Sequence, residues 1–225
     1  MEDGKAMSKL NVLYEDNQII VVEKPINVLS QGDDTRDISL LDIVKQYIKD
    51  KYNKPGNVYV GLVHRLDRPV GGVMVFARTS KAASRLNKQM MEKSFVKKYL
   101  ACVRGRMEKD QDTFTDFLLR LDNGNTIISE KGKKSVLSYC VLEYNEKKNA
   151  SLVDITLETG RHHQIRVQFA SRGHYLLGDQ RYGCQDKTQI ALYAYCLEFV
   201  HPVSKEKLSF TLKPPYNGHW TSFTL

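Results

Sequence analysis

The chain has 225 residues, of which 41% are hydrophobic and 27% charged, and its formal net charge at pH 7 is +8. This composition excludes an intrinsically disordered chain, which would be poor in apolar residues, and a membrane-spanning protein, because no stretch approaches about 20 consecutive apolar residues. The basic surplus favours a polyanionic partner, either nucleic acid or an anionic membrane surface.

The cysteines are widely spaced, and no CxxC or Cys/His pair has the spacing of a zinc site, so we expect no metal. Cys102, Cys140 and Cys196 lie in apolar or alternating runs and are predicted to be small core residues. Free cysteines suit a reducing compartment, and the N-terminus has no apolar signal segment. We therefore expect a cytoplasmic protein in which residues 1–12 form a flexible lead-in.

The start of the chain predicts two strands followed by a helix. Residues 11–29 indicate a short strand, an Asp-Asn turn and a buried strand that Pro25 ends. In residues 38–52 the apolar side chains recur at helical spacing, and Ser39 with Asp42 forms a capping box.

The middle of the chain predicts a helix between buried strands. The run from Val73 to Ala77 is typical of a buried strand, and residues 79–95 predict a second helix with one basic face. Residues 96–105 indicate a strand that ends at a glycine. Residues 113–121 and 134–159 alternate with period two, which predicts further strands and a polar hairpin.

The last third predicts a short helix over residues 160–173, for which Gly173 is a suitable C-terminal stop. Two strands follow, in residues 190–202 and 207–215. Strands outnumber helices and do not alternate evenly with them. The pattern therefore favours an α+β fold over a doubly wound α/β fold.

The segment HRLDRPVGG places Asp67 between Arg65 and Arg68, directly before a buried strand. Pro69 restricts Arg68 to an extended conformation, and glycines follow, so the loop is stiff. Stiff loops on sheet scaffolds often carry catalytic groups, which makes Asp67 a candidate reactive carboxylate. The alternative is a surface ion pair of Asp67 with either arginine, which contributes little to stability.

The segment FVKKYLACVRG places Tyr99 in an apolar strand that begins with Lys97 and Lys98. A tyrosine offers a flat ring on which a base can stack and a hydroxyl that donates or accepts a hydrogen bond. The alternative is a core tyrosine whose hydroxyl reaches the edge of the core.

A third polar cluster stands at the predicted start of the last helix: Arg161, His162, His163, Gln164 and Arg166. Backbone amides and basic side chains at such a position favour a phosphate or a carboxylate. Adjacent histidines should point to different sides of a helix, which argues against a shared metal. Arg166 lies between two apolar residues, so its guanidinium is expected to be partly buried and to need an anion, for which Asp67 is a candidate.

In this order, the three segments resemble the signature segments of RNA pseudouridine synthases of the RluA-type family. The match is carried by HRLDRPVGG, KKYLACVRG and TGRHHQIRVQFASRGHYLLGDQRYG, and LYEDNQIIVVEKPINVLSQGD resembles the family's first motif. The resemblance runs from about Leu13 to Pro215. It implies the pseudouridine synthase catalytic fold over residues 13–225, a bent, mixed, largely antiparallel β-sheet flanked by helices. Several members carry a small RNA-binding domain before this fold, and we expect no such separate domain here because few residues precede Leu13. Gly71-Gly72 stands where many members have Ser-Gly.

The resemblance also implies an activity, the isomerisation of uridine to pseudouridine in ribosomal or transfer RNA without a metal or other cofactor. It assigns the reactive carboxylate to Asp67, a stacking ring to Tyr99 and the partner of the carboxylate to Arg166. We expect the protein to be a monomer, to bind RNA and not to associate with a membrane. The predicted RNA-binding residues are Arg65, Arg68, Lys97, Lys98, Arg161, His163 and Gln164.

Two alternatives stand beside this prediction. One is a non-catalytic RNA-binding or ribosome-assembly protein on the same fold, which explains the charge but not an acid inside a basic site. The other is a hydrolase with an aspartate nucleophile, which needs further carboxylates to hold a metal, with Asp179 and Glu158 as candidates. Substrate choice depends on insertions such as residues 120–135, whose role the sequence does not reveal.

Overall fold

The computed structural model describes residues 10–225, and the predicted lead-in lies largely outside this range. In chain order the elements are β1 (Val12–Glu15), β2 (Ile19–Lys24), α1 (Leu40–Lys51), β3 (Gly61–Leu62), β4 (Gly71–Ala77), α2 (Ser80–Met91), β5 (Val96–Arg104), β6 (Gln111–Arg120), β7 (Thr126–Ile128), β8 (Lys133–Asn145), β9 (Ala150–Leu157), α3 (Gln164–Ala170), the 3₁₀ helix η1 (Gln180–Tyr182), β10 (Leu192–Val200), β11 (Lys207–Thr211) and the 3₁₀ helix η2 (Gly218–Ser222).

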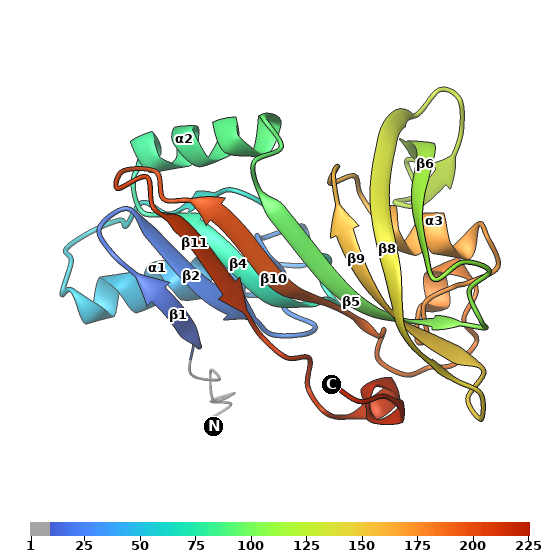
Figure 1. The fold of residues 1–225 in the computed structure, drawn as a ribbon. Helices are drawn as coiled ribbons and strands as arrows, with labels where there is room; N and C mark the ends of the chain where they lie inside the picture. Colours follow the sequence, from blue (N-terminus) through green and yellow to red (C-terminus); the bar gives the residue numbers. More distant parts are fainter. Residues whose placement is uncertain (1–9) are drawn as a thin grey trace.

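The strands of the described chain form one bent sheet in the order β1-β2-β4-β10-β5-β9-β8-β6-β7, with β3 paired to β4 and β11 to β10 (Figure 1). The pair of β4 and β10 is parallel, and the other strand pairs are antiparallel. β5 lies at the middle of the sheet, between the part that carries α1 and α2 and the part that carries α3. The predicted α+β class and mixed, largely antiparallel sheet are confirmed.

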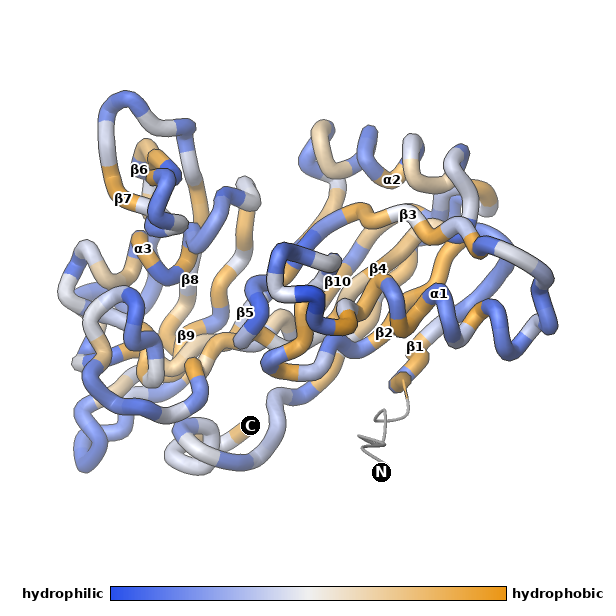
Figure 2. The backbone as a smooth tube through the Cα atoms, turned by 180° about the vertical axis from the view of Figure 1, so that it is seen from behind, coloured by the Kyte–Doolittle hydropathy of each residue, from blue (hydrophilic) through white to orange (hydrophobic). Residues whose placement is uncertain are grey.

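Strands β2 and β4 are buried on both faces because a helix covers each face. Ile20 and its neighbours on one face pack with Val44 of α1, and Val21 on the other face packs with Leu86 of α2. Residues 19–22 of β2 and 73–77 of β4 are accordingly continuous apolar runs, and Figure 2 shows both strands as largely hydrophobic. The predicted capping box is present at the start of α1, where Ser39 and Asp42 bond each other's backbone amides.

Helix α3 is shorter than predicted. It begins at Gln164 and not at residue 160, because His163 adopts a left-handed backbone conformation, with φ 51°, that cannot continue a helix. Ile165 and Phe169 pack into the same core cluster as Leu137 of β8. The helix thus fixes the position of the polar residues that precede it.

One of the three cysteines predicted to lie in the core is instead exposed at the surface. Cys102 and Cys196 are buried as predicted, but Cys140 is exposed, so its assignment to the core was wrong. Leu137 and Tyr139 of β8 face the core, and successive side chains of a strand point to opposite faces, which turns Cys140 outward.

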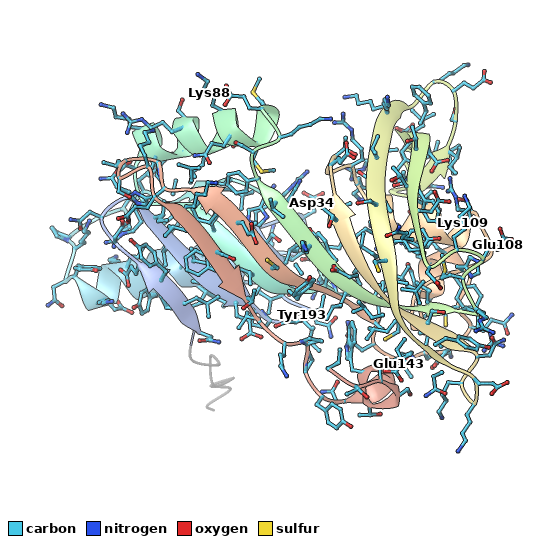
Figure 3. All side chains as sticks on the ribbon, viewed as in Figure 1. Asp34, Lys88, Glu108, Lys109, Glu143 and Tyr193 are labelled. Carbon is cyan, nitrogen blue, oxygen red and sulfur yellow. The ribbon has the colours of Figure 1, made fainter. Side chains whose placement is uncertain are left out.

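Charged side chains surround this core. Lys88 on α2 and the loop residues Glu108 and Lys109 project from the surface (Figure 3). None of the helices in residues 10–225 has both the length and the apolar character needed to cross a bilayer.

Candidate active site

A cleft of about 1010 Å³ opens between the two parts of the sheet, next to β5. The loop that follows β3 forms one wall, the segment around the start of α3 forms the other, and Tyr99 of β5 lies between them. Nine of the ten predicted site residues line this cleft: Arg65, Asp67, Arg68, Lys97, Tyr99, Arg161, His163, Gln164 and Arg166. The tenth, Lys98, is not part of the lining, and its ammonium lies 4.0 Å from Asp154.

The loop that carries Asp67 is anchored on several sides, which makes it stiff as predicted. The Ser30 hydroxyl donates to Leu66 O at 2.7 Å and accepts from Leu66 N. The buried Lys24 donates to Arg68 O at 3.0 Å, and Gln189 donates to Pro69 O at 2.6 Å. These contacts hold the backbone on both sides of Asp67.

The strand after this loop depends on Gly72. Its φ is +131°, which side chains rarely tolerate, and a Cβ there would lie 2.1 Å from Ala194 O. This close approach joins β4 to β10 in their parallel pairing. Nearby, His64 is structural, since its Nε2 accepts from Val75 N at 3.1 Å and burial lowers the pKa of this histidine to about 3.

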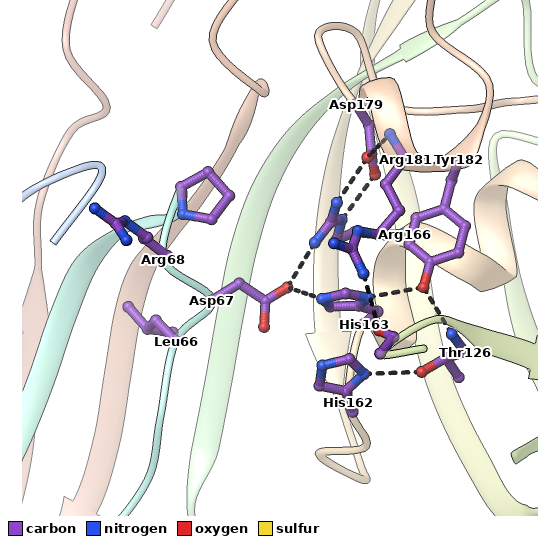
Figure 4. Close-up of polar contacts among 12 residues, drawn as sticks. Leu66, Asp67, Arg68, Thr126, His162, His163, Arg166, Asp179, Arg181 and Tyr182 are labelled. Atoms are coloured by element: carbon purple, nitrogen blue, oxygen red, sulfur yellow. Dashed lines mark hydrogen bonds and ion pairs between the residues drawn. The ribbon is translucent and has the colours of Figure 1, made fainter. Parts of the chain in front are cut away.

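Asp67 and Arg166, which are 99 positions apart, form the predicted ion pair, with Nη1 of Arg166 donating to Oδ2 of Asp67 at 3.1 Å (Figure 4). The alternative pairing with neighbouring arginines is not seen: Arg68 pairs with Asp37 at 2.7 Å, and no ion pair joins Arg65 to Asp67 in the described chain.

Arg166 has a second carboxylate partner that sequence reasoning considered only as a possible metal ligand. Nε and Nη2 of Arg166 donate to the two oxygens of Asp179 at 2.8 and 2.7 Å. Asp179 is 1% exposed, and Arg166 is 6% exposed. Although burial opposes it, the hydrogen bonds and charge of Asp179 raise the pKa of Arg166. The arginine therefore stays charged and holds a fixed orientation toward Asp67.

Tyr99 is 8% exposed, and it lines the same cleft as Asp67. Burial and the negative charge of Asp67 raise the pKa of Tyr99, so its hydroxyl stays protonated. The structure thus brings together the three residues to which the sequence assigned the chemistry.

The histidine pair differs from its prediction. The rings of His162 and His163 do not point to different sides of a helix but stack, with their centroids 3.7 Å apart. The left-handed turn at His163 places both residues before the helix. His163 Nε2 lies 3.6 Å from Asp67 Oδ2, and its Nδ1 lies 2.7 Å from the hydroxyl of Tyr182 (Figure 4).

Sequence reasoning missed Tyr182 and the role of Asp179, although both lie in the quoted segment GDQRYG. The only available signal was that segment's place in the family resemblance. Among residues 10–225 no three His, Cys, Asp or Glu side chains are placed to share a metal ion. Since both oxygens of Asp179 are engaged by Arg166, the carboxylate is not free to serve as the metal ligand that a hydrolase requires.

The remaining predicted RNA-binding residues differ in what they contact. Lys97 is 9% exposed, and within the described chain it makes no hydrogen bond or ion pair, so its ammonium is available to the cleft. Gln164 is 3% exposed. Its carbonyl accepts from Thr159 and from Arg161 N, whereas its Nε2 has no hydrogen-bond partner within residues 10–225.

Known proteins resemble this chain over most of its length. The family model described as RNA pseudouridylate synthase matches residues 18–171. An uncharacterized RNA pseudouridine synthase of Aquifex aeolicus is 34% identical over 220 residues, covering 92% of this chain and 70% of that protein. The ribosomal large subunit pseudouridine synthase D of Zymomonas mobilis is 33% identical over 224 residues, covering 92% and 69%. The ribosomal large subunit pseudouridine synthase C of Haemophilus influenzae is 31% identical over 212 residues, covering 88% of this chain and 63% of that protein. The chain therefore spans about two thirds of the length of each of these relatives.

Two solved structures share the fold. The human protein titled RNA Pseudouridylate Synthase Domain Containing 4 superposes with a TM-score of 0.78 at 20% identity, over 94% of this chain and 90% of that one. Human RNA Pseudouridylate Synthase Domain Containing 1 gives 0.76 at 25% identity, over 98% and 89%. The predicted family and the prediction of an RNA-modifying isomerase are confirmed. The fold of the sheet, the signature segments and the matched relatives all indicate the same family, and the chain belongs to the RNA pseudouridine synthases of the RluA type.

Proposed function

We propose that this chain isomerises uridine to pseudouridine in RNA of the large ribosomal subunit, with Asp67 as the reactive carboxylate. The observation that carries the proposal is an acid held in a basic cleft by a buried arginine, in which one oxygen of Asp67 is bonded to Arg166. The choice of RNA is supported by relatives named as ribosomal large subunit synthases. Transfer RNA, a monomeric state and a cytoplasmic location remain predictions from the sequence.

The chemistry requires an anionic carboxylate. Asp67 either attacks C1′ of the target ribose or takes a proton from that sugar, and both roles need the charged form. The positive charge of Arg166, 3.1 Å away, stabilises that form. The C1′–N1 bond breaks, the uracil turns, and a C5–C1′ bond replaces it. The C5 proton leaves to solvent and N1 takes up a proton, so the reaction needs no oxidant or reductant.

The target base has to leave its stack before it reaches this carboxylate. In the proposed function the ring of Tyr99 then stacks on the uracil, an interaction of about 1–3 kcal/mol per base. Lys97, Arg65 and Arg161 line the same cleft and supply positive charge for the phosphates beside the target. Arg68, Lys98, His163 and Gln164 remain predicted RNA-binding residues.

The test is tritium release from RNA labelled at C5 of uridine, using transcribed large-subunit rRNA and transcribed tRNA as separate substrates. We expect the wild-type protein to release tritium from the rRNA, and Asp67→Asn to release none while binding the RNA with unchanged affinity. Asp112→Asn is the matched control, because Asp112 lies outside the cleft and pairs with Lys109.

The outcomes separate the alternatives. Binding of RNA without any release by the wild-type protein would indicate the non-catalytic RNA-binding role. Release from tRNA and not from rRNA would overturn the substrate assignment and leave the isomerisation intact. Release by Asp67→Asn at the wild-type rate would remove Asp67 from the chemistry.

A further inference from the structure

His163 contacts two side chains of the site through its two ring nitrogens. Nδ1 lies 2.7 Å from the Tyr182 hydroxyl, and Nε2 lies 3.6 Å from Oδ2 of Asp67 (Figure 4). The side chain is 9% exposed. Its ring stacks on that of His162, with the centroids 3.7 Å apart, and packs edge-on against the ring of Tyr182 at 5.5 Å. The left-handed backbone at His163 is an unusual conformation that such surroundings hold in place.

The hydrogen bonds of Tyr182 favour one of the two neutral tautomers of His163. The amide N–H of Thr126 donates to the Tyr182 hydroxyl at 2.9 Å. That backbone group can only donate, so the hydroxyl accepts from it and has its own proton free for His163 Nδ1. A neutral imidazole that accepts at Nδ1 carries its proton on Nε2, the nitrogen that faces Asp67.

The insertion over residues 120–135 has a role in this arrangement. It contains β7, where Thr126 is 3% exposed. Besides the amide that bonds Tyr182, the Thr126 hydroxyl lies 2.9 Å from Nδ1 of His162, the histidine that stacks on His163. The insertion therefore fixes both histidines, which the sequence alone did not indicate.

Two nitrogens approach the same oxygen of Asp67, and only that of Arg166 lies within hydrogen-bond distance. Nη1 of Arg166 and Nε2 of His163 both approach Oδ2, whereas no group of residues 10–225 hydrogen-bonds Oδ1. The carboxylate is thus held from one side only. Its second oxygen is the one left for a substrate in the cleft.

We propose that Tyr182 and His163 are positioning residues for Asp67: the Tyr182 hydroxyl sets the tautomer of His163, and the Nε2–H of His163 holds Oδ2 so that Oδ1 is presented to the ribose. The inference deepens the proposed function and rests on Asp67 being the reactive group. The contact of 3.6 Å is longer than a hydrogen bond. Catalytic hydrogen bonds are often long before substrate binds, and the inference requires this contact to shorten when RNA enters the cleft.

The charges around the imidazole favour its neutral form. Burial and the neighbouring Arg166, together with His162, Arg181 and Arg120, lower the pKa of His163 to about 2. A neutral ring with a fixed tautomer aligns the carboxylate without adding a second full charge beside Arg166.

The tautomer is measured directly by long-range ¹H–¹⁵N NMR of the full chain, with the signals of His163 identified by their loss in His163→Gln. We expect a protonated Nε2 and an unprotonated Nδ1 in the wild type at neutral pH, and a shift toward the other tautomer in Tyr182→Phe. A His163 that is protonated on Nδ1 in the wild type overturns the inference. This readout needs no activity, so it stands apart from any failure of the proposed function.

A double-mutant cycle on the single-turnover rate tests the effect on catalysis. We expect Tyr182→Phe to lower this rate by about 10- to 100-fold, as a misaligned reactive group does, with unchanged RNA affinity. Glutamine at position 163 keeps a donor near Nε2 but has no tautomers, so His163→Gln should retain more activity than His163→Leu. Adding Tyr182→Phe to His163→Gln should then cost nothing further.

Tyr144→Phe is the matched control, because it removes a tyrosine hydroxyl that bonds Asn149 far from the cleft, and its rate should equal that of the wild type. An equal loss from Tyr182→Phe in the wild type and in the His163→Gln background would show that Tyr182 has only a structural role, and would overturn the inference. An unchanged rate in Tyr182→Phe would do the same.

Discussion

Both oxygens of Asp179 accept hydrogen bonds from the guanidinium of Arg166, at 2.7 and 2.8 Å, whereas Asp67 accepts a single hydrogen bond from the same group. The arginine is therefore anchored independently of the reactive carboxylate. Asp67 is free to engage a substrate without leaving a buried guanidinium unpaired, which would be costly.

This anchoring predicts a difference between two Asp–Arg pairs. We expect Asp179→Ala to lower the free energy of unfolding by about 3–5 kcal/mol, because it leaves a buried charge with one weak partner. Asp37→Ala breaks the exposed pair with Arg68 and should cost at most about 1 kcal/mol. Urea denaturation of both variants measures the difference, and equal losses would contradict the buried anchor.

Lys24 predicts a dependence of stability on pH. Burial lowers the pKa of this fully buried lysine from 10.5 to about 7, against the opposing charge of Asp67. Between these values the unfolded chain binds one proton more than the folded protein, so stability rises with pH. We expect the stability advantage of wild type over Lys24→Met to grow by up to about 1.4 kcal/mol per pH unit in this window. An advantage that is constant with pH would contradict the depressed pKa, and exposed Lys81→Met is the control.

Gly72 predicts a severe effect from the smallest possible side chain. Gly72→Ala places a methyl 2.1 Å from Ala194 O at a φ of +131°, so β4 and β10 must separate. We expect a large drop in the melting temperature or failure to fold. Gly32→Ala meets nothing within 4 Å and should melt like the wild type. A Gly72→Ala protein with wild-type stability would show that the two strands are not this close.

Tyr99 predicts that the ring and the hydroxyl have separable roles. Tyr99→Phe keeps the ring and should bind RNA as the wild type does, while Tyr99→Leu should lose about 1–3 kcal/mol of binding free energy. Fluorescence anisotropy with labelled RNA gives both affinities. If Tyr99→Leu binds as tightly as Tyr99→Phe, stacking on this ring does not contribute to binding.

The cysteines predict a single fast-reacting thiol in the native protein. Cys140 is exposed, whereas Cys102 is buried and its pKa is raised by burial, so its reactive thiolate is suppressed. We expect a thiol reagent to modify one site rapidly and Cys140→Ser to abolish that phase. Persistence of the fast phase in Cys140→Ser would place the reactive thiol elsewhere.

Local signals account for the parts of the fold that the sequence predicted. The capping box at Ser39 and Asp42 and the strand ended by Pro25 depend on neighbours in the chain, and both appear as expected. The pair of Asp67 and Arg166 joins residues 99 positions apart, and its prediction had another source. A guanidinium among apolar residues needs an anion, for which Asp67 was a candidate, and the family resemblance pairs the two residues.

Other features depend on contacts between distant residues. The left-handed turn at His163 opposes the local preference of a histidine. It is held by contacts with Asp67 and Tyr182, which lie too far along the chain for local sequence preferences to reveal them. Strands β3 and β7 have two and three residues, too few for a periodic pattern. The exposure of Cys140 followed from the register of β8, and a one-residue shift in register reverses every side chain.

The central place of β10 has a consequence for biosynthesis. This strand, Leu192–Val200, lies between β4 and β5, both of which are complete by Arg104, long before β10 is made. The two parts of the sheet that contribute Asp67 and Arg166 are therefore joined only after the chain through Val200 has left the ribosome. A nascent chain stalled before that point would contain Asp67, Tyr99 and Arg166, but the two halves of its active site would not yet be joined by β10.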